Sequence, residues 1–169
     1  MCSSDLLGFD PVIVLLTAIH FHYAGFALPL LAGEALRDRP SRLGTIGGCL
    51  ILAGVPMVAI GITTTQLGYP GWIESTSAMT LATGSLLIAI VQWKSSLRWN
   101  GLAKPLLRIS AVCLFLSMIL AIWYALRLMA AISVPDIPGM RATHGTLNAL
   151  GFAVCGMVAR SMKNMVTVL

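Results

Sequence analysis

Residues 43–73, LGTIGGCLILAGVPMVAIGITTTQLGYPGWI, form a run of 31 residues without a charged side chain. Further uncharged runs lie on both sides of it, at 11–33, 75–93, 109–126 and 142–159. A helix that spans a bilayer needs about 20 mainly apolar residues, within a range of about 17–25. Every run is long enough to span a bilayer. The run at 43–73 is longer than needed, and its polar, Gly and Pro residues at 63–72 are assigned to a turn. The sequence therefore predicts an all-α transmembrane bundle with spanning helices near 11–35, 43–65, 74–94, 105–131 and 141–161.

The composition points to the same class of protein. Of 169 residues, 57% are hydrophobic and 10% are charged, whereas a soluble domain averages about 45–50% and about 25%. This composition excludes a disordered chain and a disulfide scaffold, and no nucleic acid is expected as a partner. We expect one transmembrane domain over 7–169. Residues 1–6, MCSSDL, resemble a translated sequencing adapter and are expected to be a non-native scar, with the natural N-terminus further upstream.

Basic residues alternate between successive loops. They gather in loop 36–42, in loop 95–104 and in the tail, whereas Glu74 and Asp136 are the charged residues of loops 66–74 and 132–140. Cytoplasmic loops of membrane proteins carry an excess of Lys and Arg. The pattern predicts a multi-pass protein in contact with the lipid bilayer, with an external N-terminus and a cytoplasmic C-terminus.

Ionisable and amide side chains within these helices are candidates for a binding site. A charged residue in the membrane costs about 2.5–3.5 kcal/mol on insertion scales, so it needs a partner or a function. On the predicted topology these groups converge in the outer half of the bundle, and on the last helix three of them share one face. We expect one cavity with a positive field that binds a small polar or anionic solute, and an ion pair of Glu74 with Arg127 or Arg141. The predicted substrate-binding residues are His20, Glu74, Arg127, Arg141, His144 and Asn148.

A purely structural role for these residues is the alternative. Membrane histidines often hydrogen-bond to neighbouring helices, and His22 shares a face with small residues that suits this role. Arginines near helix ends can extend to the headgroups. Glu34 is expected to form a surface ion pair with Arg37.

Metal and cofactor sites have little support in the sequence. The cysteines lie far apart and no H-E-x-x-H motif is present, so no metal site is predicted and no cofactor is favoured. On the predicted helix starts, His20 lies about 14 Å and His144 about 5 Å into the membrane. This difference in depth argues against a haem held by both, while a haem held by a single histidine is compatible with the sequence. The Gly44-x-x-x-Gly48 pattern allows close helix packing, within the bundle or in a homo-oligomer.

Two motifs resemble a known family. FDPVIVLLTAIHFHYAGFALP at 9–29 and RATHGTLNALGF at 141–152 resemble the YndJ-like family of bacterial membrane proteins. The resemblance implies that His20, His22, His144 and Asn148 belong to the family's motifs. It also implies a location in the bacterial inner membrane, further helices upstream and a transporter, the usual label of the family. The H-G-x-L-N block is also similar, over a few residues, to small membrane haem enzymes that isomerise epoxides.

These observations leave three hypotheses for the function. The first is a transporter with the outer polar cluster as its solute site. The second is a small intramembrane enzyme that acts on a lipophilic substrate with His144 or His20 as acid or base. Such an enzyme could be haem-dependent or work without a haem. The third is a structural membrane subunit. The sequence assigns no catalytic residue.

Overall fold

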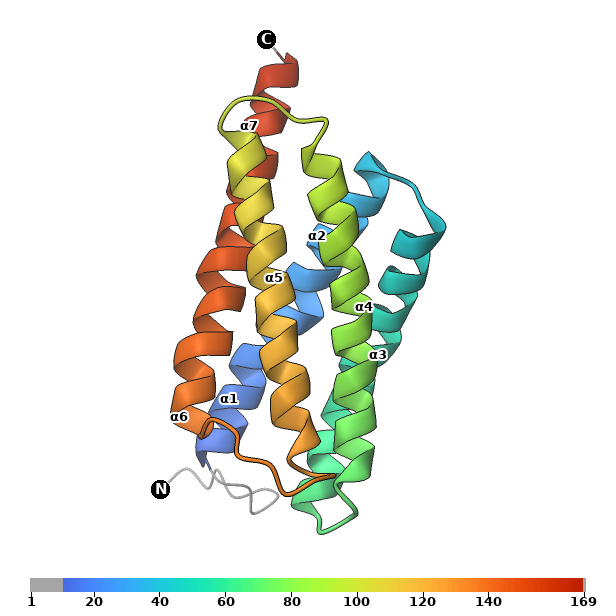
Figure 1. Cartoon of the computed structure of the whole chain (residues 1–169), viewed down its shortest axis with the longest axis vertical. Coiled ribbons are helices and arrows are strands. Elements are labelled where there is room, and N and C mark those ends of the chain that lie inside the picture. Colours follow the sequence, from blue (N-terminus) through green and yellow to red (C-terminus); the bar gives the residue numbers. More distant parts are fainter. Residues whose placement is uncertain (1–10, 169) are drawn as a thin grey trace, which may run out of the picture.

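The computed structural model describes residues 11–168, and all regular secondary structure in that part is helical. The chain forms a bundle of five helical runs (Figure 1). The first run comprises α1 (Pro11–His22), the π-helical η1 (Tyr23–Ala27) and α2 (Leu28–Asp38). The middle runs are α3 (Arg42–Gln66), α4 (Trp72–Ser96) and α5 (Ala103–Leu126). The last run comprises α6 (Ile137–Met140), the π-helical η2 (Arg141–Gly145) and η3 (Leu147–Val154), and α7 (Cys155–Val168).

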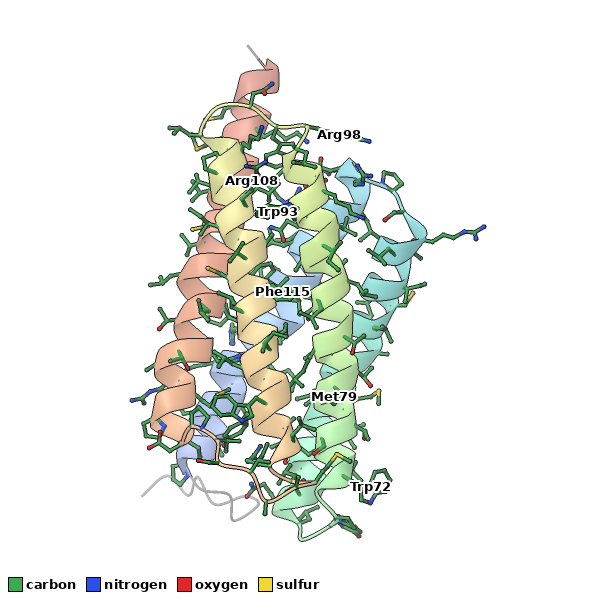
Figure 2. All side chains as sticks on the ribbon, viewed as in Figure 1. Trp72, Met79, Trp93, Arg98, Arg108 and Phe115 are labelled. Atoms are coloured by element: carbon green, nitrogen blue, oxygen red, sulfur yellow. The ribbon has the colours of Figure 1, made fainter. Side chains whose placement is uncertain are left out.

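The predicted all-α class is confirmed. In the described part of the chain α3, α4 and α5 are each long and apolar enough to cross a membrane. Large apolar side chains stand on the outside of the bundle along its length (Figure 2), among them Leu52, Ile60, Phe115 and Ile119. An exposed surface of this kind suits contact with lipid. The predicted scar at 1–6 lies outside the described residues.

Three of the predicted helix boundaries are wrong by several residues. The fourth helix ends at Leu126 instead of 131. The fifth begins at Ile137 instead of 141, because the Asp136 side chain accepts a hydrogen bond from the backbone N–H of Gly139, 2.8 Å away, and Pro138 occupies the first turn. That helix also continues to Val168 instead of ending at 161. The earlier start moves every residue of the last run deeper into the bundle.

Glycines bring α3 and α4 close together. Gly47, Gly54 and Gly61 lie seven residues apart on the side of α3 that faces α4. A Cβ atom on Gly54 would lie 2.8 Å from Cα of Leu81, and one on Gly61 would lie 2.8 Å from Cα of Glu74. Only glycine permits so close an approach of two backbones. The contact at Gly61 fixes the start of α4 and with it the position of Glu74.

The Gly44-x-x-x-Gly48 pattern serves packing within the chain. A Cβ atom on Gly44 would lie 3.2 Å from Cγ of Leu36, and one on Gly48 would lie 3.9 Å from Cδ2 of the same side chain. The pattern therefore joins α3 to α2. A homo-oligomer through helix packing stays a prediction.

The end of the first run is held by charged groups. Arg160 of α7 is buried and its Nη1 lies 2.9 Å from Oδ2 of Asp38. Its guanidinium also lies 5.6 Å from the ring centre of Trp99, in the α4–α5 connection. The predicted pair of Glu34 and Arg37 is confirmed, with 2.6 Å between Oε2 and Nη2. From these ion pairs at the end of α2, the first run crosses the bundle obliquely (blue in Figure 1). As a result, α1 is separated from α3 at the opposite end of the bundle.

Candidate functional site

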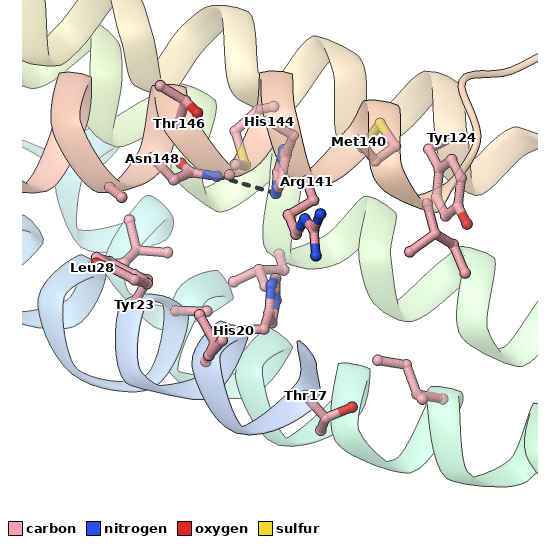
Figure 3. A pocket seen from close by; sticks show the side chains of 18 of the residues that line it. Thr17, His20, Tyr23, Leu28, Tyr124, Met140, Arg141, His144, Thr146 and Asn148 are labelled. Atoms are coloured by element: carbon pink, nitrogen blue, oxygen red, sulfur yellow. Dashed lines mark hydrogen bonds between the residues drawn. The ribbon is translucent and has the colours of Figure 1, made fainter. Parts of the chain in front are cut away.

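Residues from all five helical runs line a cavity of about 600 Å³. The oblique course of the first run leaves this space between α1, α3, α5 and the last run. All of the predicted site residues contribute to its wall (Figure 3 labels four of them): His20, Glu74, Arg127, Arg141, His144 and Asn148. A cavity of this size is typical of small-molecule sites. The structure therefore brings the predicted residues together, whereas their role in binding a substrate stays a prediction.

The cavity wall contains the π-helical segments of the bundle. Tyr23 belongs to η1, His144 to η2 and Asn148 to η3, and all three line the cavity. A π-helical turn changes the backbone hydrogen bonding of a helix and is frequent at functional sites. Ser110 of α5 donates a hydrogen bond to the backbone carbonyl of Phe152 in η3, at 2.8 Å. Sequence periodicity assumes 3.6 residues per turn, so it gave no signal for these segments.

His144 is fixed in orientation by both ring nitrogens. Its Nε2 accepts a hydrogen bond from Nδ2 of Asn148 at 3.0 Å, because an amide nitrogen can only donate. Its Nδ1 therefore carries the proton and donates to the backbone carbonyl of Ser117, 3.0 Å away. The Ser117 hydroxyl oxygen also lies 3.0 Å from Nδ1. The arrangement holds a neutral imidazole in one tautomer at the cavity wall.

The two cavity histidines face each other. The ring centres of His20 and His144 are 6.4 Å apart and the ring planes are inclined by 16°. The predicted difference in depth is wrong, because the last run starts at Ile137 and places His144 deeper. The depths of the two histidines therefore give no ground against a haem held by both. Within residues 11–168, no group of three His, Cys, Asp or Glu side chains is placed to hold a metal ion.

His22 lies outside the cavity. Its side chain is exposed, and its Nδ1 lies 2.8 Å from the backbone carbonyl of Ala18 in the same helix. It contributes a hydrogen bond within α1 rather than the predicted bond between helices.

The charges of the cavity do not cancel. Arg127 Nη2 lies 3.4 Å from Oε1 of Glu74, which confirms the predicted ion pair, and its guanidinium stacks 3.6 Å from the ring centre of Tyr124. Arg141 forms no hydrogen bond or ion pair with any residue of the described chain. Figure 3 shows its side chain pointing from the last run toward the helix that carries His20. Among the described residues, one guanidinium of the cavity therefore has no compensating carboxylate.

The inner wall of the cavity is apolar, and sequence reasoning missed it. These residues belong to the uncharged runs, where nothing distinguishes a cavity wall from an ordinary core position. They are largely buried and come from α2, α4, α5 and η3: Leu28, Leu81, Leu114, Met118 and Phe152.

Comparisons with known proteins agree with the two motifs quoted above. The family model described as YndJ-like protein matches residues 1–152. The chain is also 24% identical, over 157 residues, to a protein of Bacillus subtilis (strain 168) described as "Uncharacterized membrane protein YndJ". The match covers 91% of this chain and 28% of that protein, so the chain spans little more than a quarter of the relative's length. No solved structure matches the chain. The chain is a membrane protein that belongs to the YndJ-like family.

Proposed function

We propose that the chain contributes the solute site of a membrane transporter, and that its cavity binds a small polar or anionic solute. The observation that carries the proposal is Arg141, a guanidinium that lines the cavity without a carboxylate partner in the described chain. The nearby Glu74 is already paired with Arg127. An anion would supply the missing charge, and a guanidinium can bind a carboxylate or phosphate with two parallel hydrogen bonds.

The surroundings of Arg141 favour an anion further. Arg141 is an exposed residue of the cavity wall, and the wall beyond it is formed mostly by apolar side chains, so a charge-charge interaction there is stronger than in open water but is partly screened by solvent. Neutral His144 adds no second positive charge, while its partner Asn148 retains a second amide hydrogen for a ligand. These features support one bound anion rather than a site for a cation.

The predicted membrane orientation is part of this proposal. Basic residues gather in the α2–α3 connection at 36–42 and in the α4–α5 connection at 95–104. This distribution supports a cytoplasmic location for the end of the bundle at which α7 ends. The cavity would then open toward the outer face of the bacterial inner membrane. A homo-oligomer would be compatible with this arrangement.

An intramembrane enzyme is the second candidate, and the fixed tautomer of His144 favours it. A neutral imidazole whose Nδ1–H is held by a carbonyl has its basic lone pair on Nε2, and the Asn148 amide that donates to this nitrogen would have to release it before His144 acted as a general base. A Soret absorption band in the purified protein would identify a bound haem and favour this candidate over the transporter.

Equilibrium binding tests the proposed solute site. The purified chain in lipid nanodiscs is titrated with radiolabelled acetate and with radiolabelled inorganic phosphate, and empty nanodiscs are subtracted. We expect one of these anions to bind the unaltered chain and Arg141→Gln to weaken its binding at least tenfold. The matched control is Arg98→Gln, an exposed position in the α4–α5 connection. Equal binding by Arg141→Gln and by the unaltered chain would overturn the proposal.

A further inference from the structure

The cavity changes from polar to apolar along its length. On the last run Arg141, His144 and Asn148 line its outer part, and buried Phe152 lines its inner part. At 1.5 Å per residue, Arg141 and Phe152 lie about 16 Å apart along the helix axis. The last run alone therefore combines a charged end and an apolar end within one cavity.

The other helices repeat this gradient in the same direction. On α4, Glu74 precedes Leu81 by about 10 Å of helix, and on the first run His20 precedes Leu28 by about 12 Å. On α5, which runs the opposite way, Leu114 precedes the polar end. Since every wall turns apolar at the same end, the gradient is a property of the whole cavity.

The side of the cavity reaches the surface that faces lipid. Ile19 and Tyr23 of the first run and Leu150 of the last run line the cavity, yet their exposed fractions are 48%, 38% and 62%. Exposed side chains on both runs that also line the cavity indicate a lateral opening between these two runs. An alkyl chain could pass through such an opening without leaving an apolar environment.

From these observations we infer that the natural ligand is a single-chain anionic amphiphile. Its acidic head lies against Arg141, and its alkyl chain lies along the apolar inner wall between Leu81, Leu114 and Phe152. A small hydrophilic anion would leave the inner part unfilled, and apolar cavities do not hold ordered water well. This inference rests on the proposed anion site and adds the chemical class of its ligand.

A homologous series of ligands tests the inference. The chain in nanodiscs of phosphatidylcholine is titrated with radiolabelled acetate, hexanoate and decanoate, and separately with hexyl and decyl phosphate, with empty nanodiscs subtracted. Affinity referred to the free aqueous ligand is expected to rise about fourfold for each methylene that enters the cavity. The carboxylate and phosphate series distinguish a fatty acid from a single-chain phospholipid as the source of the head. Decanol, which has no charge, is expected to bind at least tenfold more weakly than decanoate.

Two variants separate filling of the cavity from general effects on the bundle. Ala149→Phe places a ring on the cavity wall and is expected to retain acetate binding while the gain with chain length disappears. Val154→Phe makes a comparable change on the exposed side of the same run and is expected to retain the gain. Circular dichroism and gel filtration verify that both variants are folded.

The outcomes distinguish this inference from the proposed function. If short anions bind in an Arg141-dependent way and decanoate gains nothing over acetate, the amphiphile is wrong and the anion site stands. If no ligand of either series depends on Arg141, both are wrong. If the gain with chain length is the same in Ala149→Phe, the alkyl chain does not lie in this cavity and the inference is overturned.

Discussion

The imidazole rings of His20 and His144 lie nearly parallel at 6.4 Å between centres, although one belongs to the first helical run and the other to the last. The two sequence motifs of this chain, at 9–29 and 141–152, therefore meet at one cavity. Both runs contain π-helical turns beside the histidines, at η1 and η2. The contact brings polar residues of the first and last runs together at the cavity to which the middle helices contribute Glu74 and Arg127.

Replacing His144 tests whether it serves the site or only joins helices. His144→Ala removes the hydrogen bonds to Ser117 and Asn148, so stability is expected to fall by about 1–2 kcal/mol. Anion binding is expected to fall at least tenfold, because Asn148 loses its fixed orientation. Thermal unfolding and acetate or phosphate binding measure the two effects.

His22→Ala is the matched control, since His22 bonds only within its own helix and lies outside the cavity. It should retain anion binding. Unchanged binding in His144→Ala, together with lost stability, would reduce His144 to a contact between helices.

The helices were predictable because uncharged runs of this length have few other structural solutions. The runs 43–65 and 74–94 became α3 and α4, with ends within two residues of the prediction. The start of the last helix was missed because Pro135-Asp136-Ile137-Pro138 was interpreted as loop, whereas Asp136 caps a helix. Capping depends on backbone geometry that the composition of a loop does not reveal.

The convergence of site residues was predictable from topology, but their detailed geometry was not. Alternating basic loops placed Glu74, Arg127 and Arg141 at one end of the bundle, and the pair of Glu74 with Arg127 followed from the cost of an isolated charge. The close approach of the His20 and His144 rings depends on where the last run begins and on the oblique course of the first run. The π-helical turns and the apolar inner wall depend on packing, which leaves no periodic signal in uniformly apolar helices.

Two glycines of the last run should respond oppositely to the same substitution. A Cβ atom on Gly151 would collide with Sγ of Cys113 and would lie 2.6 Å from its Cβ, so Gly151→Ala must push α5 away and is expected to cost about 1–3 kcal/mol. A Cβ atom on Gly145 meets no described atom within 4 Å, so Gly145→Ala is expected to be neutral or to stabilise by up to about 1 kcal/mol. Unfolding of both variants in mixed micelles measures the difference. Equal effects would show that α5 and the last run are not in close contact at Gly151.

Accessibility of the loops checks the predicted orientation. In a variant with every native cysteine replaced by alanine, Tyr69→Cys and Asn100→Cys introduce exposed thiols at opposite ends of the bundle. A membrane-impermeant maleimide is expected to label Tyr69→Cys on intact cells and to label Asn100→Cys only after permeabilisation, because basic loops stay in the cytoplasm. Labelling of Asn100→Cys from outside would reverse the orientation and place the cavity on the cytoplasmic side.

The ion pair between α2 and α7 should be a major contribution to stability. Asp38→Asn removes the 2.9 Å carboxylate partner of Arg160, whose side chain is 8% exposed, and leaves Arg160 with the more distant Glu34, 3.7 Å away. Loss of one member of a buried pair is expected to cost about 3 kcal/mol. Arg37→Gln is the control, since Arg37 is 68% exposed and its pair with Glu34 should contribute less than about 1 kcal/mol. Similar losses in the two variants would show that solvent screens the Asp38–Arg160 pair as well.

Changing the charge of the Glu74–Arg127 pair tests the electrostatic basis of anion binding. Glu74→Gln removes the only carboxylate among the described cavity residues and leaves Arg127 uncompensated. A second uncompensated positive charge in the cavity is expected to raise the affinity of the bound anion roughly tenfold, which corresponds to about 1.4 kcal/mol. Arg127→Gln leaves Glu74 uncompensated and is expected to lower the affinity by a similar factor. The double variant restores the charge balance and should bind like the unaltered chain in the acetate or phosphate titration.

These opposite changes in anion affinity distinguish an electrostatic role of the Glu74–Arg127 pair from a purely structural one. If the pair only joined α4 to α5, each single variant would lose stability and binding together, and the double variant would not recover. Raised salt is expected to shrink both single-variant effects, because added ions screen charges near the cavity mouth. Weaker anion binding in Glu74→Gln, in a variant whose thermal unfolding is unchanged, would contradict a cavity whose positive charge attracts the ligand.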